Sequence, residues 1–331
     1  MILSASRATD IPAFYSEWFF DRLEKGYCLW RNPFNGIDNY VSFQDVRFIV
    51  FWSKNPAPLI PYLERLQEKS IRCYIQYTLN DYESERLEPG VPTLAQRIET
   101  FKTLADKLGK GSVVWRFDPM ILTDKMCLDN LLEKVRNIGD QLKGYTEKLV
   151  FSFVDIASYR KVKSNLEKHG VNYFEWNETL MIEFAEKLSA MNRECGWNFT
   201  LTTCSERIDL AKYGIAHNRC VDDELISRIA WQDKYLMDYL GIRLGSIERN
   251  IFEEEILPEG AWKVSDSLYA IRIRGNRDLG QRQYCGCVSS KDIGAYNTCP
   301  HGCVYCYANT TPESARKSSH RHNPRSDSII K

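Results

Sequence analysis

The sequence predicts an α/β fold, in which a parallel (βα)6-type sheet forms a partial or full TIM-like barrel and a cysteine-rich segment follows at the C-terminus. Short apolar runs alternate with longer segments of helical periodicity through the first two-thirds of the 331 residues. Six such β-then-α repeats are typical of parallel α/β architecture. A doubly wound open sheet is the structural alternative, because periodicity alone does not separate it from a barrel.

Six short segments have the composition of buried parallel strands. Each is rich in β-branched and aromatic residues and nearly free of charge, which suits a strand covered on both faces. The six segments are Met1–Ser6, Arg47–Trp52, Cys73–Thr78, Val113–Phe117, Lys148–Val154 and Asn198–Thr203.

Helical segments lie between these strands, with apolar residues spaced three and four apart. They are Leu59–Lys69, Thr93–Leu108, Leu128–Leu142, Tyr159–His169 and Glu178–Cys195. Gly109, Gly170 and Gly196 follow three of them, where a helix commonly ends on a residue with positive φ.

Polar residues follow each predicted strand, and strand C-terminal ends in this class face the ligand. The sequence therefore predicts one polar mouth. Capping and turn chemistry accounts equally well for any single Asp, Asn, Ser or Thr among them, but an arginine such as Arg116 does not cap a helix N-terminus. The residues are Arg7, Thr9, Asp10, Ser53, Lys54, Asn55, Asn80, Asp81, Arg116, Asp118, Asp155, Cys204 and Glu206.

The chain divides into three parts by pattern. Residues 1–215 carry the alternation and form the predicted barrel domain. Residues 216–311 form a helical and then cysteine-rich segment, whose last stretch, Gln281–Thr311, is too poor in long apolar runs to bury much core of its own. Residues 312–331 are basic and polar without periodicity, and we expect them to be disordered.

Composition points to a protein of a reducing compartment. The 44 lysines and arginines balance 44 aspartates and glutamates, so net charge gives no support for nucleic-acid binding. The N-terminus does not resemble a signal peptide, and no apolar run approaches the roughly 20 residues of a membrane helix. We therefore expect a cytoplasmic protein without a membrane partner, whose 11 cysteines serve metal binding rather than disulfides.

The strongest motif is Cys299-Pro-His-Gly-Cys303-Val-Tyr-Cys306, which reads C-x-x-x-C-x-x-C. Three thiolates at this spacing suit three corners of a four-iron cluster and leave the fourth iron without a cysteine. Gly302 allows a sharp turn, and Tyr305 is placed to shield the cluster or stack on a ligand. A structural zinc site completed by His301 and Cys285 or Cys287 is the alternative.

This motif resembles the signature of the radical S-adenosylmethionine (SAM) enzymes. The resemblance implies that the free iron chelates SAM, and that SAM is cleaved to a 5′-deoxyadenosyl radical that abstracts hydrogen from the substrate. It also implies an α/β barrel and an electron donor such as flavodoxin or ferredoxin. The substrate, a small molecule or a peptide, is unknown. In that superfamily the motif usually lies after the first strand, whereas here it follows the barrel.

In this interpretation Cys299, Cys303 and Cys306 are the catalytic residues. The residues that bind cofactor and substrate are Arg7, Asp10, Lys54, Arg116, Asp118, Asp155 and Tyr305. An Arg116–Asp118 pair that braces the mouth is an equally good explanation of those two residues. The C-terminal segment must fold back to bring the free iron to the mouth.

Over nearly its whole length the chain also resembles a prokaryotic family named domain of unknown function 1848. The matching stretches are Ser4–Pro12, Phe51–Pro56, Trp115–Leu122 and Gln281–Asn309. The resemblance carries no known function.

A second cysteine set consists of Cys204, Cys220, Cys285 and Cys287. Four thiolates suit a second, fully ligated four-iron cluster, as in some radical SAM enzymes. A zinc ion in the same cage is one alternative, and small buried hydrophobic residues at Cys204 and Cys220 are another. For the whole protein, the alternatives are an iron–sulfur redox or sensory protein that does not cleave SAM, and a zinc-stabilised barrel that binds a small molecule.

Overall fold

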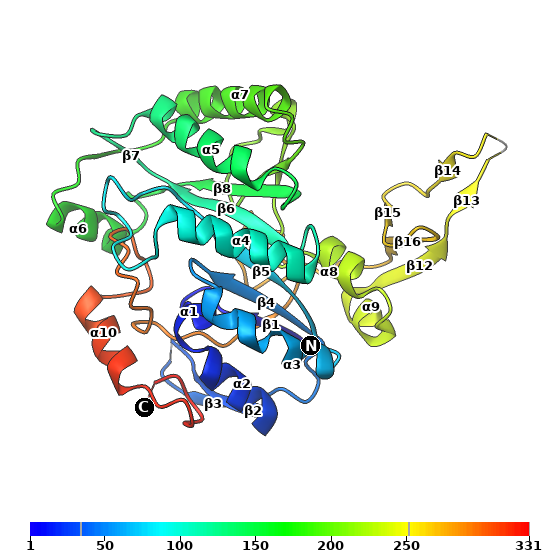
Figure 1. Cartoon of the computed structure of the whole chain (residues 1–331), viewed down its shortest axis with the longest axis horizontal. Coiled ribbons are helices and arrows are strands. Elements are labelled where there is room, and N and C mark those ends of the chain that lie inside the picture. The colour runs from blue at the N-terminus through cyan, green and yellow to red at the C-terminus, as the bar shows by residue number, and fades with distance from the viewer. Residues whose placement is uncertain (34, 251, 331) are drawn as a thin grey trace.

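The computed structural model describes residues 1–33, 35–250 and 252–330. Its centre is an eight-stranded parallel sheet with the order β17-β1-β4-β5-β6-β8-β10-β11 (Figure 1). The strands are β1 (Ile2–Ala5), β4 (Phe48–Ser53), β5 (Arg72–Thr78), β6 (Val113–Met120), β8 (Lys148–Phe153), β10 (Thr200–Thr203), β11 (Ile215–His217) and β17 (Lys291–Asp292). The parallel α/β class is thus confirmed.

All six predicted strands are present, as β1, β4, β5, β6, β8 and β10. The strands from β1 to β11 are added in chain order on one side, without the reversal of a doubly wound sheet. The edge strands β11 and β17 do not pair with each other in the described part of the chain, so the sheet is not a closed barrel. The expectation of a full barrel is therefore corrected to an open sheet with sequential strand order.

Helices pack on one face of this sheet. They are α1 (Ile11–Phe14), α2 (Ser16–Lys25), α3 (Leu63–Glu68), α4 (Leu94–Leu108), α5 (Leu128–Leu142), α6 (Arg160–Lys168) and α7 (Glu178–Glu194), with short 3-10 helices η1 (Ala57–Tyr62) and η2 (Ala211–Tyr213). The five predicted helices correspond to η1 with α3, α4, α5, α6 and α7. The glycines after α4, α6 and α7 have positive φ, as expected.

Alternate residues of each strand enter two separate cores, as the two-residue period of a strand requires. On the helix-covered face, Leu3, Phe51 and Trp115 pack into the larger core. On the other face, Ile2 and Val50 pack against helices α8 (Asp223–Ala230) and α9 (Lys234–Leu240) and the segment around Val288. This second face is apolar near the strand starts, and it carries Gln76, Arg116 and Cys204 near the strand ends.

An arm extends away from the sheet beyond α9 (Figure 1). It consists of β12 (Ile242–Ser246), β15 (Trp262–Lys263) and β16 (Leu268–Arg272) with the hairpin of β13 (Glu248–Arg249) and β14 (Glu255–Ile256). Two further pairs complete the strands: β2 (Tyr27–Arg31) with β3 (Asp38–Ser42), and β7 (Leu122–Thr123) with β9 (Tyr173–Phe174).

The C-terminal stretch differs from the prediction of disorder. Residues Pro312–Arg321 form helix α10, whose N-terminus is capped by the Thr311 side chain. Beyond the helix, the Trp18 indole donates to the Ser326 carbonyl at 2.9 Å, and Ile329 is buried in the larger core. The basic composition therefore does not prevent folding here, because α10 packs on the N-terminal helices. Among the described residues, no helix has the length and apolar character needed to cross a bilayer.

Candidate functional site

Strand β17 carries the C-x-x-x-C-x-x-C motif to the mouth of the sheet. β17 pairs in parallel with β1, and the Asp292 carboxylate accepts from the Ser4 hydroxyl at 2.8 Å and from the Arg7 amide at 3.0 Å. The motif follows β17 directly and α10 follows the motif. β17, the cysteine loop and α10 thus form one more β-loop-α unit at the edge of the sheet, and its loop lies at the C-terminal ends of the strands.

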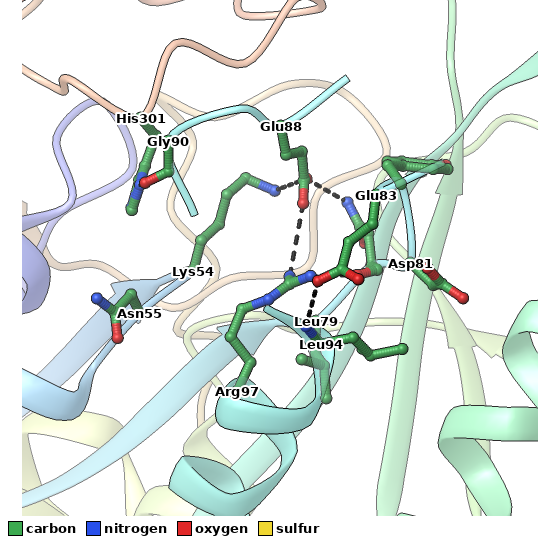
Figure 2. Close-up of polar contacts among 12 residues, drawn as sticks. Lys54, Asn55, Leu79, Asp81, Glu83, Glu88, Gly90, Leu94, Arg97 and His301 are labelled. Atoms are coloured by element: carbon green, nitrogen blue, oxygen red, sulfur yellow. Dashed lines mark hydrogen bonds and ion pairs between the residues drawn. The ribbon is translucent and has the colours of Figure 1, made fainter. Parts of the chain in front are cut away.

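The motif is held against the loop that follows β5. The Gly90 amide donates to the His301 carbonyl at 2.8 Å, and the Val304 amide donates to the Leu87 carbonyl at 2.9 Å. A Cβ atom at Gly90 would lie only 2.3 Å from the His301 carbonyl oxygen, so this close approach requires glycine. Figure 2 shows Gly90 and His301 side by side.

His301 is fixed on both sides of its ring. Its Nδ1 lies 3.0 Å from the Gly90 carbonyl oxygen and its Nε2 lies 2.7 Å from Asp10 Oδ2. Both oxygens are hydrogen-bond acceptors, and each ring nitrogen is engaged with one of them. Neither nitrogen is free to bind a metal, which argues against the zinc site that His301 would complete.

Asp10 is a buried anchor between the motif and the strands. Its carboxylate also accepts from the Ser53 hydroxyl at 2.7 Å, the Lys54 amide at 2.8 Å and the Ala13 amide at 3.0 Å, the last of which caps α1. Burial alone would raise the pKa of Asp10, but these hydrogen bonds, chiefly that from His301, hold it below its ordinary value.

Lys54, Glu88 and Arg97 belong to a buried polar network (Figure 2), and the charges of Lys54 and Glu88 act on Cys303. Lys54 Nζ contacts Glu88 Oε1 at 2.7 Å and the Tyr305 hydroxyl at 3.0 Å, and Tyr305 donates to Glu88. Asn80 donates to the same carboxylate at 2.9 Å, and Arg97 lies 3.5 Å from its second oxygen. Burial opposes ionisation of Glu88, but Lys54 and Arg97 lower its pKa below the ordinary value. Glu88 and Arg97 were not predicted from the sequence.

The three motif thiols are near enough for their charges to interact, and Cys299 and Cys303 are desolvated. Burial raises the pKa of Cys299 to about 12 and also raises that of Cys303, and each is raised further by the charge of neighbouring motif thiols. The charge of Lys54 acts on Cys303 in the opposite direction. A small cavity adjoins Cys303 and Cys306 and is also lined by Asn165, His169 and Asn309.

The second cysteine set also comes together, on the second face of the sheet. We call Cys204, Cys220, Cys285 and Cys287 the four-thiol group. Cys204 Sγ lies 3.5 Å from Cys220 Sγ, Cys220 and Cys287 share a hydrogen bond, and so do Cys287 and Cys285. The hydrogen bonds from Cys204 and Cys287, together with the Arg116 guanidinium, lower the pKa of Cys220 well below its ordinary value.

Arg116 and Arg7 face the four-thiol group. Arg116 Nη1 donates to Cys220 Sγ at 3.0 Å, while its Nη2 pairs with Asp118 as the alternative explanation predicts. Both guanidinium groups lie over the Trp52 ring, at 5.1 Å for Arg7 and 5.3 Å for Arg116. Arg7 Nη2 is buried without a hydrogen-bond partner.

The predicted site residues therefore fall into two groups and one exception. Asp10, Lys54 and Tyr305 contact the motif or its anchors, whereas Arg7, Arg116 and Asp118 surround the four-thiol group. Asp155 is exposed and accepts from the Ser158 amide at 3.0 Å, which is a turn contact. Within the described ranges, no three His, Cys, Asp or Glu side chains are grouped so that they could hold a single metal ion.

Comparison with known proteins adds the family. Residues 2–308 match the family described as Domain of unknown function (DUF1848). No curated protein matches the chain, and no solved structure does. Since the match covers nearly all of the 331 residues, the chain belongs to the DUF1848 family.

Proposed function

We propose that this protein is a radical SAM-type enzyme, with Cys299, Cys303 and Cys306 as the ligands of a four-iron cluster. The observation that carries the proposal is the position of the motif in the sheet. The motif is late in the chain, but it follows β17, which is the first strand in spatial order. In the superfamily that the motif resembles, it likewise follows the first strand, so the arrangement matches that of a permuted chain.

The donor set suits such a cluster. The motif offers three thiols, both ring nitrogens of His301 are engaged with other residues, and three thiolates would leave one iron open. A cluster held by Cys299, Cys303 and Cys306 would supply the one electron needed to cleave SAM reductively, and with it the chemistry for hydrogen abstraction from a substrate. The electron must come from outside the chain, and we propose a small donor such as flavodoxin or ferredoxin in the cytoplasm.

Asp10, Lys54 and Tyr305 act in this proposal by positioning the cysteine loop. Asp10 is saturated by His301, Ser53 and the Lys54 amide, and the Lys54 ammonium is paired with Glu88. These contacts fix the loop on both sides of Cys303, and the Lys54 charge favours its thiolate form over the thiol. A loop fixed in this way would hold its three cysteines in place as ligands.

The test is anaerobic purification followed by an assay for SAM cleavage. The parent protein should be brown, and with dithionite and SAM it should release 5′-deoxyadenosine. Cys306→Ala should abolish this release. The matched control is Cys127→Ala, because Cys127 is exposed beside α5 and far along the chain from the motif. A brown parent without 5′-deoxyadenosine would favour a redox or sensory protein, and a colourless zinc protein would contradict both.

A further inference from the structure

The four-thiol group lies apart from the motif and joins three chain segments. Cys204 follows β10, Cys220 follows β11, and Cys285 and Cys287 precede β17. The Val221 amide donates to Cys287 Sγ at 3.3 Å, and the Val288 amide donates to the Val221 carbonyl at 3.0 Å. These contacts join the ends of β10 and β11 to the segment that leads into β17, which lies on the opposite edge of the sheet.

The residues around the four-thiol group include a buried hydrogen-bond donor for which the thiols supply no acceptor. Arg116 directs Nη1 at Cys220, and Arg7 Nη2 is buried without a partner. The carboxylates that face these guanidiniums are Asp118, paired with Arg116, and Asp292, near Arg7. A buried donor left without an acceptor is unfavourable, because it has lost its hydrogen bonds to water. Sulfur atoms of a bound metal centre would supply the acceptor that Arg7 lacks.

The contacts among the sulfurs fit a metal centre without choosing its kind. The thiols contact one another in the sequence Cys204, Cys220, Cys287 and Cys285, and four sulfurs at about 2.3 Å from a tetrahedral zinc would also lie close to one another. In the part of the chain that the structure describes, no three ligand-type side chains are grouped so that they could hold a single metal ion. The two guanidiniums favour a four-iron cluster, because its inorganic sulfur atoms add hydrogen-bond acceptors to the four thiolates.

We propose that Cys204, Cys220, Cys285 and Cys287 hold a second, fully cysteine-ligated four-iron cluster, and that Arg7 and Arg116 donate hydrogen bonds to its sulfur atoms. This cluster has no open iron and does not bind SAM. Arg7 also adjoins the motif, because its carbonyl accepts from the Tyr307 hydroxyl at 2.8 Å, one residue beyond Cys306. The proposal stands on the four-thiol group alone and does not require that SAM is cleaved.

The first experiment removes the motif and keeps the four-thiol group. The full chain carrying Cys299→Ala, Cys303→Ala and Cys306→Ala is purified without oxygen. It should retain about half of the parent's iron and sulfide and show a dithionite-reduced paramagnetic signal that SAM does not change. A colourless protein, or one with stoichiometric zinc, would overturn the proposal.

A second variant removes two cysteines of the four-thiol group and keeps the motif. It tests the proposal even if the triple variant does not fold. Cys285→Ser with Cys287→Ser should lose the same share of iron and keep the signal that SAM perturbs. Cys73→Ala is the control, because Cys73 is a core thiol of β5 and should leave the iron content unchanged. Unchanged iron in the reciprocal variant would overturn the proposal, whereas failure of SAM cleavage with this iron intact would contradict only the proposed function.

The hydrogen bond proposed for the Arg7 guanidinium can be tested separately, by measuring the reduction potential of the second cluster. Removing a positive hydrogen-bond donor beside the cluster disfavours its reduced, more negative form. Arg7→Gln should therefore shift the reduction potential of the SAM-insensitive signal to a more negative value without loss of iron. Arg47→Gln, at the opposite end of the strands and paired with Asp233, should leave that potential unchanged. Equal potentials for the parent and Arg7→Gln would overturn the assigned role of Arg7.

Discussion

Lys291 in β17 is the parallel strand partner of Leu3 in β1, although nearly the whole chain separates them. This pairing makes the C-terminal segment the first strand of the sheet in space. It also explains how a motif near the C-terminus reaches the loops that follow β1, β4 and β5.

The Asp292 carboxylate is central to this docking. Besides Ser4 and the Arg7 amide, it accepts from the Gly294 amide at 2.9 Å. Asp292→Ala leaves these donors without an acceptor, and we expect a loss of about 1–3 kcal/mol in the free energy of unfolding. Urea unfolding measures the loss. Asp266→Ala removes a fully exposed carboxylate and should change little, so equal losses for the two variants would contradict the docking role.

Substitution of Gly90 tests whether its contact with the His301 backbone holds the cysteine loop in place. Because a Cβ there would collide with the His301 backbone, Gly90→Ala should displace the loop and lower the iron retained after anaerobic purification. The same substitution at Gly275 meets no atom within 4 Å and involves no positive φ. Gly275→Ala should therefore retain the parent's iron. Full iron content in Gly90→Ala would show that the loop does not depend on this contact.

The Lys54–Glu88 pair should behave as a buried ion pair. The Glu88 side chain is 2% exposed and that of Lys54 is 17% exposed. Lys54→Met removes the main positive charge beside Glu88, and we expect a loss of about 3–5 kcal/mol in unfolding free energy. Lys54→Met with Glu88→Leu removes both charges and should recover part of that loss. Additive effects in this double-mutant cycle would mean that the pair is not coupled.

Asp223 should make stability depend on acid pH. It is fully buried, which by itself would raise its pKa, but hydrogen bonds from Arg272 and Asn276 and the charge of Arg219 lower it below the ordinary value. A carboxylate with a lowered folded pKa stabilises the fold above its unfolded pKa of about 3.9 and loses that contribution as the pH falls. Asp223→Asn should be less stable by about 3 kcal/mol at pH 7.

The difference between the parent and Asp223→Asn should shrink as the pH falls below about 4. Guanidinium unfolding at pH 7, 5 and 3 measures it. The same difference at pH 3 as at pH 7 would show that the carboxylate is not stabilised as an anion in the fold.

Local patterns predicted the elements of the sheet. The six long strands and five helices carry their periodicity within a few residues, so apolar spacing and C-terminal glycines were sufficient. β17 was missed because only Lys291 and Asp292 form it, and its pairing with β1 is long-range. The tail was predicted as disordered from its composition, whereas its order comes from contacts such as that of Trp18 with Ser326.

The cysteines of the candidate site could be predicted from the sequence. The residues that hold the cysteine loop in place were harder to predict. The motif spacing is a local signal, and the four-thiol group was assembled from separated cysteines that the structure does bring close. Glu88 and Arg97 lie in a loop and a helix whose relation to Cys303 depends on the docking of β17. The Glu88-Pro89-Gly90 turn was the one local signal for a close backbone approach there.

The most direct test of the account is the paramagnetic resonance spectrum of the dithionite-reduced protein, recorded with and without SAM. The account predicts that SAM changes the spectrum of one cluster in the parent and in Cys127→Ala, and that this change is absent in Cys303→Ala. Identical spectra with and without SAM in a fully iron-loaded parent would contradict the claim that Cys299, Cys303 and Cys306 hold a cluster with an open iron.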